Sequence, residues 1–446
     1  MITDDPDAAD VSRSGFLSAP LDPASADRLA GAGLRYRSVP VDDPASFDPW
    51  VQVVARGFQD GERSAEQLAA IRERSAYRRV TGVYDGSAPD PDAPVATIAS
   101  WIGELAVPGG VGIPSCAISA VTVAPTHRRR GIARAMLEGE LRVAAASGAP
   151  AAMLTVSEST LYGRYGFASA APAAAWRIDV KRAAWTGPVP AGRVDFISRE
   201  RLRELIPALH DSVRLGTPGE IDVPAGHWDT LAGTRPDAKD AGEVRAVQYA
   251  DTSGTVRGLA LYRVSENHDD HTKATVDVVY LLAADDDAYA ALWRFFVELD
   301  LVGEVRAREL SVDEPLWWMI SDQRAATVTV SDHQYIRILD VPAALAARRY
   351  GAAGRLVLDV EDPLGLADGR FVLEVDADGS ARATRTTDAA PDAISLSLGI
   401  RELAAVYLGG VSVVTLARAG LIAASDPVAA ARVFGWHQPP RLSFWY

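Results

Sequence analysis

Apolar positions along the chain change their spacing several times, and each spacing predicts a type of element. Runs rich in apolar and β-branched residues predict strands at 95–101, 116–123 and 152–156. Between the last two, apolar residues recur on one helical face and predict a helix over 132–146; they are Ile132, Met136, Leu137, Leu141 and Ala144. The sequence therefore predicts a strand–loop–helix–strand unit in the first third of the chain.

The same alternation returns in the middle third, and the last third differs. In the middle we expect helices over 202–215 and 285–299, with strands over 258–264 and 274–282. In the last third the pattern predicts strands at 356–360 and 370–375, a hairpin turn at Asp378-Gly379 into 381–386, and helices at 400–407 and 411–419. Passages of small residues, Pro and Gly near 168–195 predict a change of domain there.

Composition narrows the class of protein. A chain of 446 residues with 48% apolar residues is long enough for about three domains with packed cores. The net charge of −14 argues against nucleic acid as a partner and favours a cationic one, although acidity also serves solubility alone. The single cysteine, Cys116, excludes an intrachain disulfide.

The chain start and the apolar runs suggest a location. Residues 1–33 are rich in Asp, Pro, Ser and Ala without periodicity, so we expect a loosely held arm and no secretion signal. The longest apolar run, 403–416, is too short to span a membrane and contains Gly409 and Gly410. We therefore expect a cytoplasmic protein with no membrane partner.

The loop between the 116–123 strand and the 132–146 helix has the composition of an anion site. Backbone N–H groups at a helix start lack intrahelical partners, and the helix dipole makes that end positive. Gly131 lets a ligand approach the backbone, and the arginines at 128, 129 and 130 bring charge for a diphosphate. The glycine spacing matches neither a dinucleotide fingerprint nor a P-loop.

A second strand–loop–helix frame at 278–292 lacks these features. Asp285, Asp286 and Asp287 stand where the first loop has arginines, and the glycine is missing. Aspartates favour a helix start but repel a diphosphate. The sequence therefore predicts a degenerate second copy that does not bind the ligand of the first.

The segment Arg128-x-x-Gly131-x-Ala133 resembles the acetyl-CoA signature of the GNAT superfamily of N-acetyltransferases. Beyond the arm, the whole chain resembles the enhanced intracellular survival (Eis) family of aminoglycoside acetyltransferases, on segments at 121–131, 157–158 with 162–167, 223–228, 260–264 and 341–345. The resemblance implies a mixed α/β, α+β fold class with two tandem GNAT folds, the second degenerate, and a sterol-carrier-protein-like α+β domain. The expected boundaries are 1–33 for the arm, then 34–167, 168–332 and 333–446.

The resemblance also implies an activity, N-acetylation of polycationic amines such as aminoglycosides, and hence antibiotic resistance. Acetyl-CoA would be the co-substrate, with a homohexamer as the assembly and no metal. The implied acetyl-CoA contacts are Val121, Thr122, Val123, Arg128, Arg129, Arg130, Gly131, Ile132, Ala133, Arg134, Ser157 and Glu158. The implied substrate contacts are Phe58, Asp60, Ala120, Trp228 and Trp445.

The implied catalytic groups are a tyrosine acid and a base at the chain end. Tyr162 matches the family's acid, with Tyr165 as a competitor three residues on. The base would be the terminal carboxylate of Tyr446, which is ionised at neutral pH because its ordinary pKa is about 3.5. Two departures point to a reshaped amine pocket: Ala120 stands where a large aromatic is frequent, and Trp445-Tyr446 stands where the family has an acidic residue and Phe.

Other interpretations remain open. Transfer to a protein or peptide lysine is one alternative, and a non-catalytic lipid-binding or scaffold protein is another. The intact loop from Arg128 to Ala133 argues against the scaffold. The segment His268-Asp-Asp-His271 resembles a metal-binding cluster, but its polar, loop-like surroundings predict a solvated turn and no metal.

Overall fold

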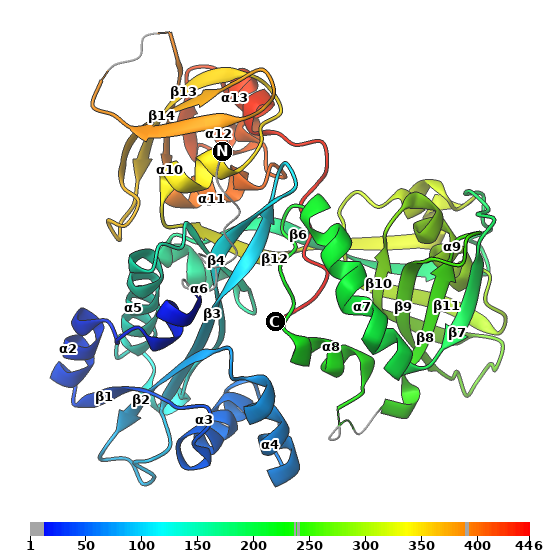
Figure 1. The fold of residues 1–446 in the computed structure, drawn as a ribbon, viewed down its shortest axis with the longest axis horizontal. Coiled ribbons are helices and arrows are strands. Elements are labelled where there is room, and N and C mark those ends of the chain that lie inside the picture. The colour runs from blue at the N-terminus through cyan, green and yellow to red at the C-terminus, as the bar shows by residue number, and fades with distance from the viewer. Residues whose placement is uncertain (1–12, 236–237, 239–240, 389–391) are drawn as a thin grey trace. The chain divides into compact units, whose positions relative to one another are not determined.

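A computed structural model describes residues 13–235, 238, 241–388 and 392–446, which form two compact units (Figure 1). Of the described residues, those within 1–170 and 334–437 and Tyr446 form unit 1, and those within 171–333 and 438–445 form unit 2. The first and last thirds of the chain therefore belong to one unit, and the middle third forms the other. Strand β12 (Ala326–Ile338) contributes its end, from Gln334 onward, to unit 1.

The first part of unit 1 is a sheet in the order β1-β2-β3-β4-β5, followed by the end of β12. Its neighbours pair antiparallel except β4 and β5, which are parallel and are joined by helix α5. The strands are β1 (Leu34–Ser38), β2 (Arg79–Asp85), β3 (Ala96–Val107), β4 (Val111–Val123) and β5 (Ala151–Thr155). The helices are α3 (Pro44–Gly57), α4 (Ala65–Arg74), α5 (Ile132–Ala146) and α6 (Ser159–Tyr162), with 3₁₀ turns at Pro125–His127 and Gly163–Tyr165.

Helix α5 spans the residues that its apolar spacing predicts. The stripe formed by Ile132, Met136, Leu137, Leu141 and Ala144 is buried throughout. It packs in one cluster with Ile118 of β4, Leu154 of β5 and Phe167. Because this stripe holds α5 against the sheet, it also positions the loop that connects β4 to the start of α5.

Residues 13–33 differ from the loosely held arm expected there. Residues 13–18 are helical and α2 (Pro23–Gly31) follows, with Phe16 and Leu29 buried in the unit 1 core. Ser25 Oγ donates to the Ala135 carbonyl of α5 at 2.6 Å. The expectation was wrong for these residues because two buried apolar side chains suffice to dock a short helix, without a periodic stripe. Residues 1–12 lie outside the described residues.

The last part of unit 1 is a small α+β module. Its sheet has the order β15-β14-β13-β16-β17. The strands are β13 (Gly354–Glu361), β14 (Gly369–Val375), β15 (Ala381–Arg385), β16 (Ile394–Gly399) and β17 (Ile422–Ala424), and the helices are α10 (Val341–Ala347), α11 (Ile400–Tyr407), α12 (Val413–Arg418) and α13 (Pro427–Phe434). The buried Arg348 donates to the Tyr407 and Phe434 carbonyls, so one guanidinium caps the C-terminal ends of α11 and α13.

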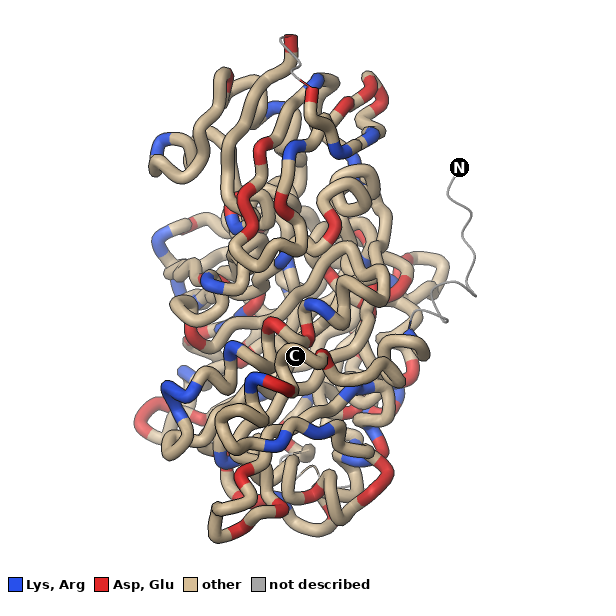
Figure 2. The backbone as a smooth tube through the Cα atoms, turned by 90° about the vertical axis from the view of Figure 1, so that its left-hand side faces the viewer, with Lys and Arg blue, Asp and Glu red and all other residues tan. Residues whose placement is uncertain are grey.

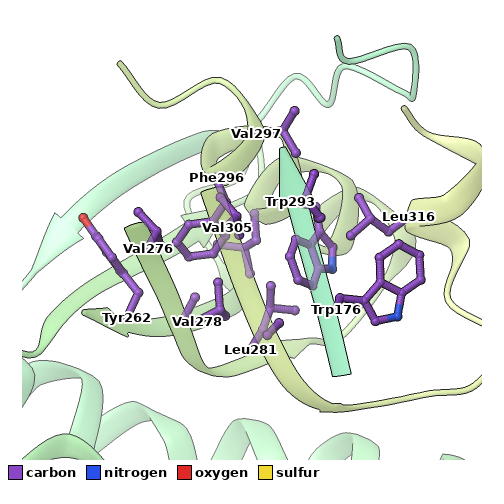
Figure 3. Packing of buried hydrophobic residues seen from close by; sticks show 14 of the residues in the cluster. Trp176, Tyr262, Val276, Val278, Leu281, Trp293, Phe296, Val297, Val305 and Leu316 are labelled. Atoms are coloured by element: carbon purple, nitrogen blue, oxygen red, sulfur yellow. The ribbon is translucent and has the colours of Figure 1, made fainter. Parts of the chain in front are cut away.

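Unit 2 repeats the β–α–β frame of unit 1. Its strands follow the order β6-β11-β10-β9-β8-β7, and β10 and β11 are parallel across α9. The elements are β6 (Ala168–Asp179), β7 (Arg193–Ile197), β8 (Arg245–Ala250), β9 (Val256–Ser265), β10 (Ala274–Ala283), β11 (Val302–Leu310), α7 (Arg199–Val213), α8 (Ala225–Ala232) and α9 (Asp286–Val297). Trp293 and Phe296 of α9 pack against the sheet beside Trp176, as Figure 3 shows.

Acidic and basic positions are interspersed along the backbone (Figure 2). No helix among the described residues combines the length and the apolar character that crossing a bilayer requires.

Candidate functional site

The two parallel strands of unit 1 separate where the candidate site begins. Strand β4 pairs with β5 from Ser115 to Ala117, and no pairing between the two is recorded beyond that point in the described part of the chain. A bulge follows: Ala120 has φ of +53°, and the register against β3 shifts nearby. The β4 edge at Val121–Val123 is therefore available to a ligand.

Side chains behind the bulge hold it in place. Thr97 Oγ1 donates to the Ala120 carbonyl at 2.8 Å and lies 2.7 Å from Thr122 Oγ1. A small residue at position 120 suits this left-handed backbone better than a bulky one. Ala120 thus shapes the strand backbone.

The loop before α5 presents an uncapped helix start. Gly131 is the N-cap, with φ of +76°, and no side chain caps the first turn. A Cβ added at Gly131 would meet no atom within 4 Å, so the space beside this N-cap is open. Arg128 and Arg129 are exposed beside it. A free helix start, open space and exposed guanidinium groups together fit a diphosphate.

One arginine of the loop and one in the first turn of α5 have partners in the protein. Arg130 forms an ion pair with Asp85 at 3.6 Å, and Arg134 Nε donates to Glu138 at 2.6 Å. His127 also contacts Asp85, at 3.2 Å. Hydrogen bonds from Ser87, and a smaller one from His127, lower the pKa of Asp85, which stays ionised and anchors the loop. Sequence reasoning missed Asp85, which lies at the end of β2, far along the chain from the loop it holds.

The equivalent helix start in unit 2 is closed by its own side chain. Asp285 caps α9 by accepting from the Ala288 N–H at 2.9 Å, and it pairs with Arg257 at 3.0 Å. Asp286 and Asp287 occupy the first turn. This helix start is thus both capped and acidic, unlike that of α5.

Tyr162 ends α6 and lies half-buried against Phe167, with ring centroids 6.2 Å apart. Burial, with smaller contributions from Tyr165 and Glu158, raises the pKa of Tyr162 to about 12. Its hydroxyl is therefore protonated at neutral pH. Tyr165 belongs to the packed core and is 5% exposed, so it is less suited to meet a ligand. Ser157 and Glu158, just before α6, are exposed.

Tyr446 lies against the end of β5. Thr155 Oγ1 donates to the main-chain oxygen of Tyr446 at 2.8 Å. The Tyr446 ring packs edge-to-face on Trp101, with centroids 5.4 Å apart, and burial raises the pKa of its phenol. Thr155 and Trp101 are contacts that sequence reasoning did not identify, because no local pattern links residues so distant along the chain.

The predicted substrate residues separate into two groups. Phe58 is exposed and Asp60 follows it in the loop after α3, where it pairs with Arg63 at 2.5 Å. Gly57, at the end of α3, packs against Thr122 of β4. Phe58, Asp60 and Ala120 thus belong to unit 1, as do Tyr162 and Tyr446.

Trp228 and Trp445 belong to unit 2 instead. Trp228 is 2% exposed and packs against His210 and Tyr280 in a core cluster, so the structure does not support it as a substrate contact. Trp445 packs on His333, with ring centroids 5.1 Å apart. Within the described ranges no group of three or more His, Cys, Asp or Glu side chains is arranged to hold a metal.

A cavity beside the Asp60 loop is acidic. It measures about 580 Å³ and its wall includes the carboxylates of Asp48, Asp60, Glu62 and Asp90, with Arg56 as a counter-charge. Asp48 also pairs with Arg72. Asp60 is paired with Arg63, so the negative charge available to a cation comes mainly from Glu62 and Asp90.

Family models match three stretches of the chain. Two models described as acetyltransferase (GNAT) domains match residues 41–170 and 219–338, and a sterol carrier protein domain matches residues 341–443. These matches confirm the predicted fold class of two GNAT domains and a sterol-carrier-like domain.

Individual relatives agree. An uncharacterized N-acetyltransferase of Streptomyces avermitilis is 36% identical over 86% of this chain and 91% of its own length. The N-acetyltransferase Eis of Mycobacterium tuberculosis is 34% identical over 77% of this chain and 83% of its own. The crystal structure of Eis1 from Mycobacterium abscessus superposes with a TM-score of 0.78 at 27% identity, covering 93% of this chain and 100% of that one. The chain therefore belongs to the Eis family of GNAT N-acetyltransferases and is an acetyltransferase.

Proposed function

We propose that this enzyme acetylates amines of polycationic small molecules, such as aminoglycosides, by direct transfer from acetyl-CoA. The observation that carries the substrate class is the cavity of about 580 Å³, whose lining includes Asp48, Asp60, Glu62 and Asp90. Asp48 and Asp60 form ion pairs with Arg72 and Arg63, so the attraction for a cation falls mainly to Glu62 and Asp90. A ligand with several ammonium groups matches several carboxylates, whereas a single lysine presents one charge. The net charge of −14 favours the same class.

Acetyl-CoA supplies the activated acetyl group. We assign its diphosphate to the uncapped start of α5 at Gly131, with Arg128 and Arg129 beside it. Strand β4 pairs with β3 at Thr122 and Val123, and its β5 pairing ends at Ala117. Main-chain groups on its other edge at Val121 to Val123 can therefore hydrogen-bond an extended ligand or a thioester oxygen. Unit 2 would bind no acetyl-CoA, because Asp285 caps the start of helix α9.

Tyr162 is the proposed partner of the leaving sulfur. A full proton transfer from a phenol of pKa about 12 to a thiolate of pKa about 8.5 runs uphill by roughly 5 kcal/mol. The hydroxyl therefore acts chiefly by donating a hydrogen bond to the sulfur as negative charge develops there. Its raised pKa keeps that donor present throughout the neutral pH range.

The proposed base is the carboxylate of Tyr446. An alkylammonium with a pKa of about 10 must lose a proton before it attacks. Thr155 fixes one oxygen of Tyr446 at 2.8 Å, at the end of β5 where the two parallel strands have separated. This hydrogen bond supports a base that is held in one place.

A thiol-release assay tests the proposal. The full chain is incubated with acetyl-CoA and three acceptors: an aminoglycoside, a linear polyamine and a lysine-containing peptide. We expect free thiol with the polycations and an acetylated product by mass spectrometry. A preference for the peptide would support a protein lysine acetyltransferase instead. The homohexamer expected from the family is likewise a proposal, which sedimentation tests.

A further inference from the structure

A buried ion pair joins the sterol-carrier-like module to the catalytic GNAT domain. Arg337 on β12 and Asp362, which follows β13, are both fully buried, with 2.6 Å between Nη2 and Oδ2. Asp362 also accepts the backbone N–H groups of Leu364, Leu366 and Ala367. Buried ion pairs contribute little net stability because desolvation offsets their attraction. The other N–H groups of Arg337, on Nε and Nη1, point to a positional role for the pair.

Arg337 holds the turn that follows Tyr162. Its Nε donates to the Tyr165 carbonyl at 2.8 Å, and its Nη1 donates to the Ile338 carbonyl at 2.5 Å. Gly166, with φ of +87°, packs so closely on the guanidinium that a Cβ there would overlap it. The end of the turn is therefore locked to the Arg337–Asp362 pair by a hydrogen bond and by contact.

The beginning of the same turn meets the module as well. A Cβ built on Gly163 would lie 3.2 Å from Arg401 Cζ, so the Arg401 guanidinium lies against this glycine. Arg401 is exposed and belongs to α11 of the sterol-carrier-like module. Arg401 of the module thus contacts Gly163, which is next to Tyr162. Arg337, which pairs with Asp362 of the module, holds Tyr165.

We propose that Arg337, anchored by Asp362, is a positioning residue for Tyr162, and that the sterol-carrier-like module serves to hold the acid's turn. The inference rests on the proposed role of Tyr162. Arg337 is fully buried, so it acts through the turn backbone. Only Gly163 and Arg164 separate Tyr162 from the anchored Tyr165, so a displacement of the turn moves the phenol directly. A misplacement of about 1 Å can reduce a rate about 100-fold.

The main test replaces Arg337→Lys, which keeps the charge beside Asp362 but cannot direct separate donors to Asp362, Tyr165 and Ile338. Arg348→Lys is the matched control, because Arg348 is also buried and donates to carbonyls within the sterol-carrier-like module, among them those of Tyr407 and Phe434, which lie outside the turn. We expect Arg337→Lys to lower kcat about 10- to 100-fold with KM for acetyl-CoA within about twofold. Arg348→Lys should lower the melting temperature and keep kcat within about twofold.

A double-mutant cycle separates positioning from general stability. If Arg337 acts through Tyr162, then Arg337→Lys should have no further effect on kcat in a Tyr162→Phe background. Multiplicative losses would overturn the inference, as would an equal loss in Arg348→Lys. Should Arg337→Lys fail to fold, the exposed Arg401→Gln takes its place, and we expect a loss of about threefold or more that also vanishes in the Tyr162→Phe background.

The two proposals fail differently. A wild-type chain that releases no thiol with any amine refutes the proposed function. An active chain that loses kcat in Tyr162→Phe but keeps it in both Arg337→Lys and Arg401→Gln refutes the positioning role alone.

Discussion

Gly131→Asp should convert the acetyl-CoA loop of unit 1 into the closed form found in unit 2. The Cβ meets nothing within 4 Å, so the free protein accommodates the side chain sterically. The backbone there is left-handed, which costs a non-glycine residue roughly 1 kcal/mol, although Asp is among the residues that tolerate it best. Asp is also a better N-cap than Gly, by a few tenths of a kcal/mol, so the net cost stays below about 1 kcal/mol. The melting temperature should therefore change little.

Binding should change much more than folding. A carboxylate about 6 Å from one diphosphate charge, at an effective dielectric constant near 20, repels it by roughly 3 kcal/mol. That is about a 100-fold loss of affinity, before counting N–H groups that the new carboxylate occupies. Gly131→Asn is the matched control, because it has the same shape and capping capacity without the charge.

Calorimetric titration with acetyl-CoA at low and high salt measures the effect. We expect Gly131→Asp to bind at least tenfold more weakly than Gly131→Asn at low salt, with a smaller difference at high salt because exposed charges are screened. Equal affinities for the wild type and Gly131→Asp in a folded protein would refute the assignment of the diphosphate to this helix start.

Four further outcomes are expected. Calorimetry should find one acetyl-CoA per chain, and two equivalent sites would contradict the degenerate reading of unit 2. Tyr162→Phe should lower kcat about 10- to 100-fold with acetyl-CoA affinity nearly unchanged. Because the pKa of Tyr162 is raised to about 12, its hydroxyl stays protonated below that pH. An alkaline fall in wild-type kcat that is centred below pH 10 and disappears in Tyr162→Phe would contradict its assignment. Asp60→Asn should raise KM for aminoglycosides about threefold or more at low salt and less at high salt, and a KM independent of salt would argue against electrostatic selection. Thr155→Val removes the hydrogen-bond donor to Tyr446, and one glycine added after Tyr446 moves the terminal carboxylate by up to about 3.5 Å. Each change should lower kcat. Full activity in the extended chain would exclude this carboxylate as the base.

Apolar spacing and capping residues in the sequence correctly predicted helix α5 and the starts of α5 and α9. The apolar stripe of α5 gave both its ends, and Gly131 marked the helix start that the structure leaves uncapped. The aspartates at 285–287 marked the closed start of α9. These features depend on residues within one or two turns of each other, where periodicity and capping preferences act directly.

Long-range contacts could not be predicted in this way. Glu140 of α5 is buried and pairs with Arg79 at 3.2 Å, while Ser100 donates to it. Burial raises the pKa of Glu140, and its partners Arg79 and Ser100 lie on strands β2 and β3, where no local pattern could identify them. The Thr155 contact to Tyr446 spans 291 positions. Such pairs follow from the tertiary fold, which determines which polar groups meet.

The pairing of β12 with β5 affects how this enzyme can be divided. Residues Gln334 to Ile338 cover the β5 edge across its whole length, from Thr155 to Ala151. A fragment cut after residue 170 would keep the acetyl-CoA loop and Tyr162 but expose β5 as a bare, apolar edge strand, which is prone to join other chains. It would also lack Arg337 and Asp362. We therefore expect the first GNAT domain to aggregate when expressed alone, and the synthesis of a functional catalytic sheet to be finished only after the ribosome has passed the middle third of the chain.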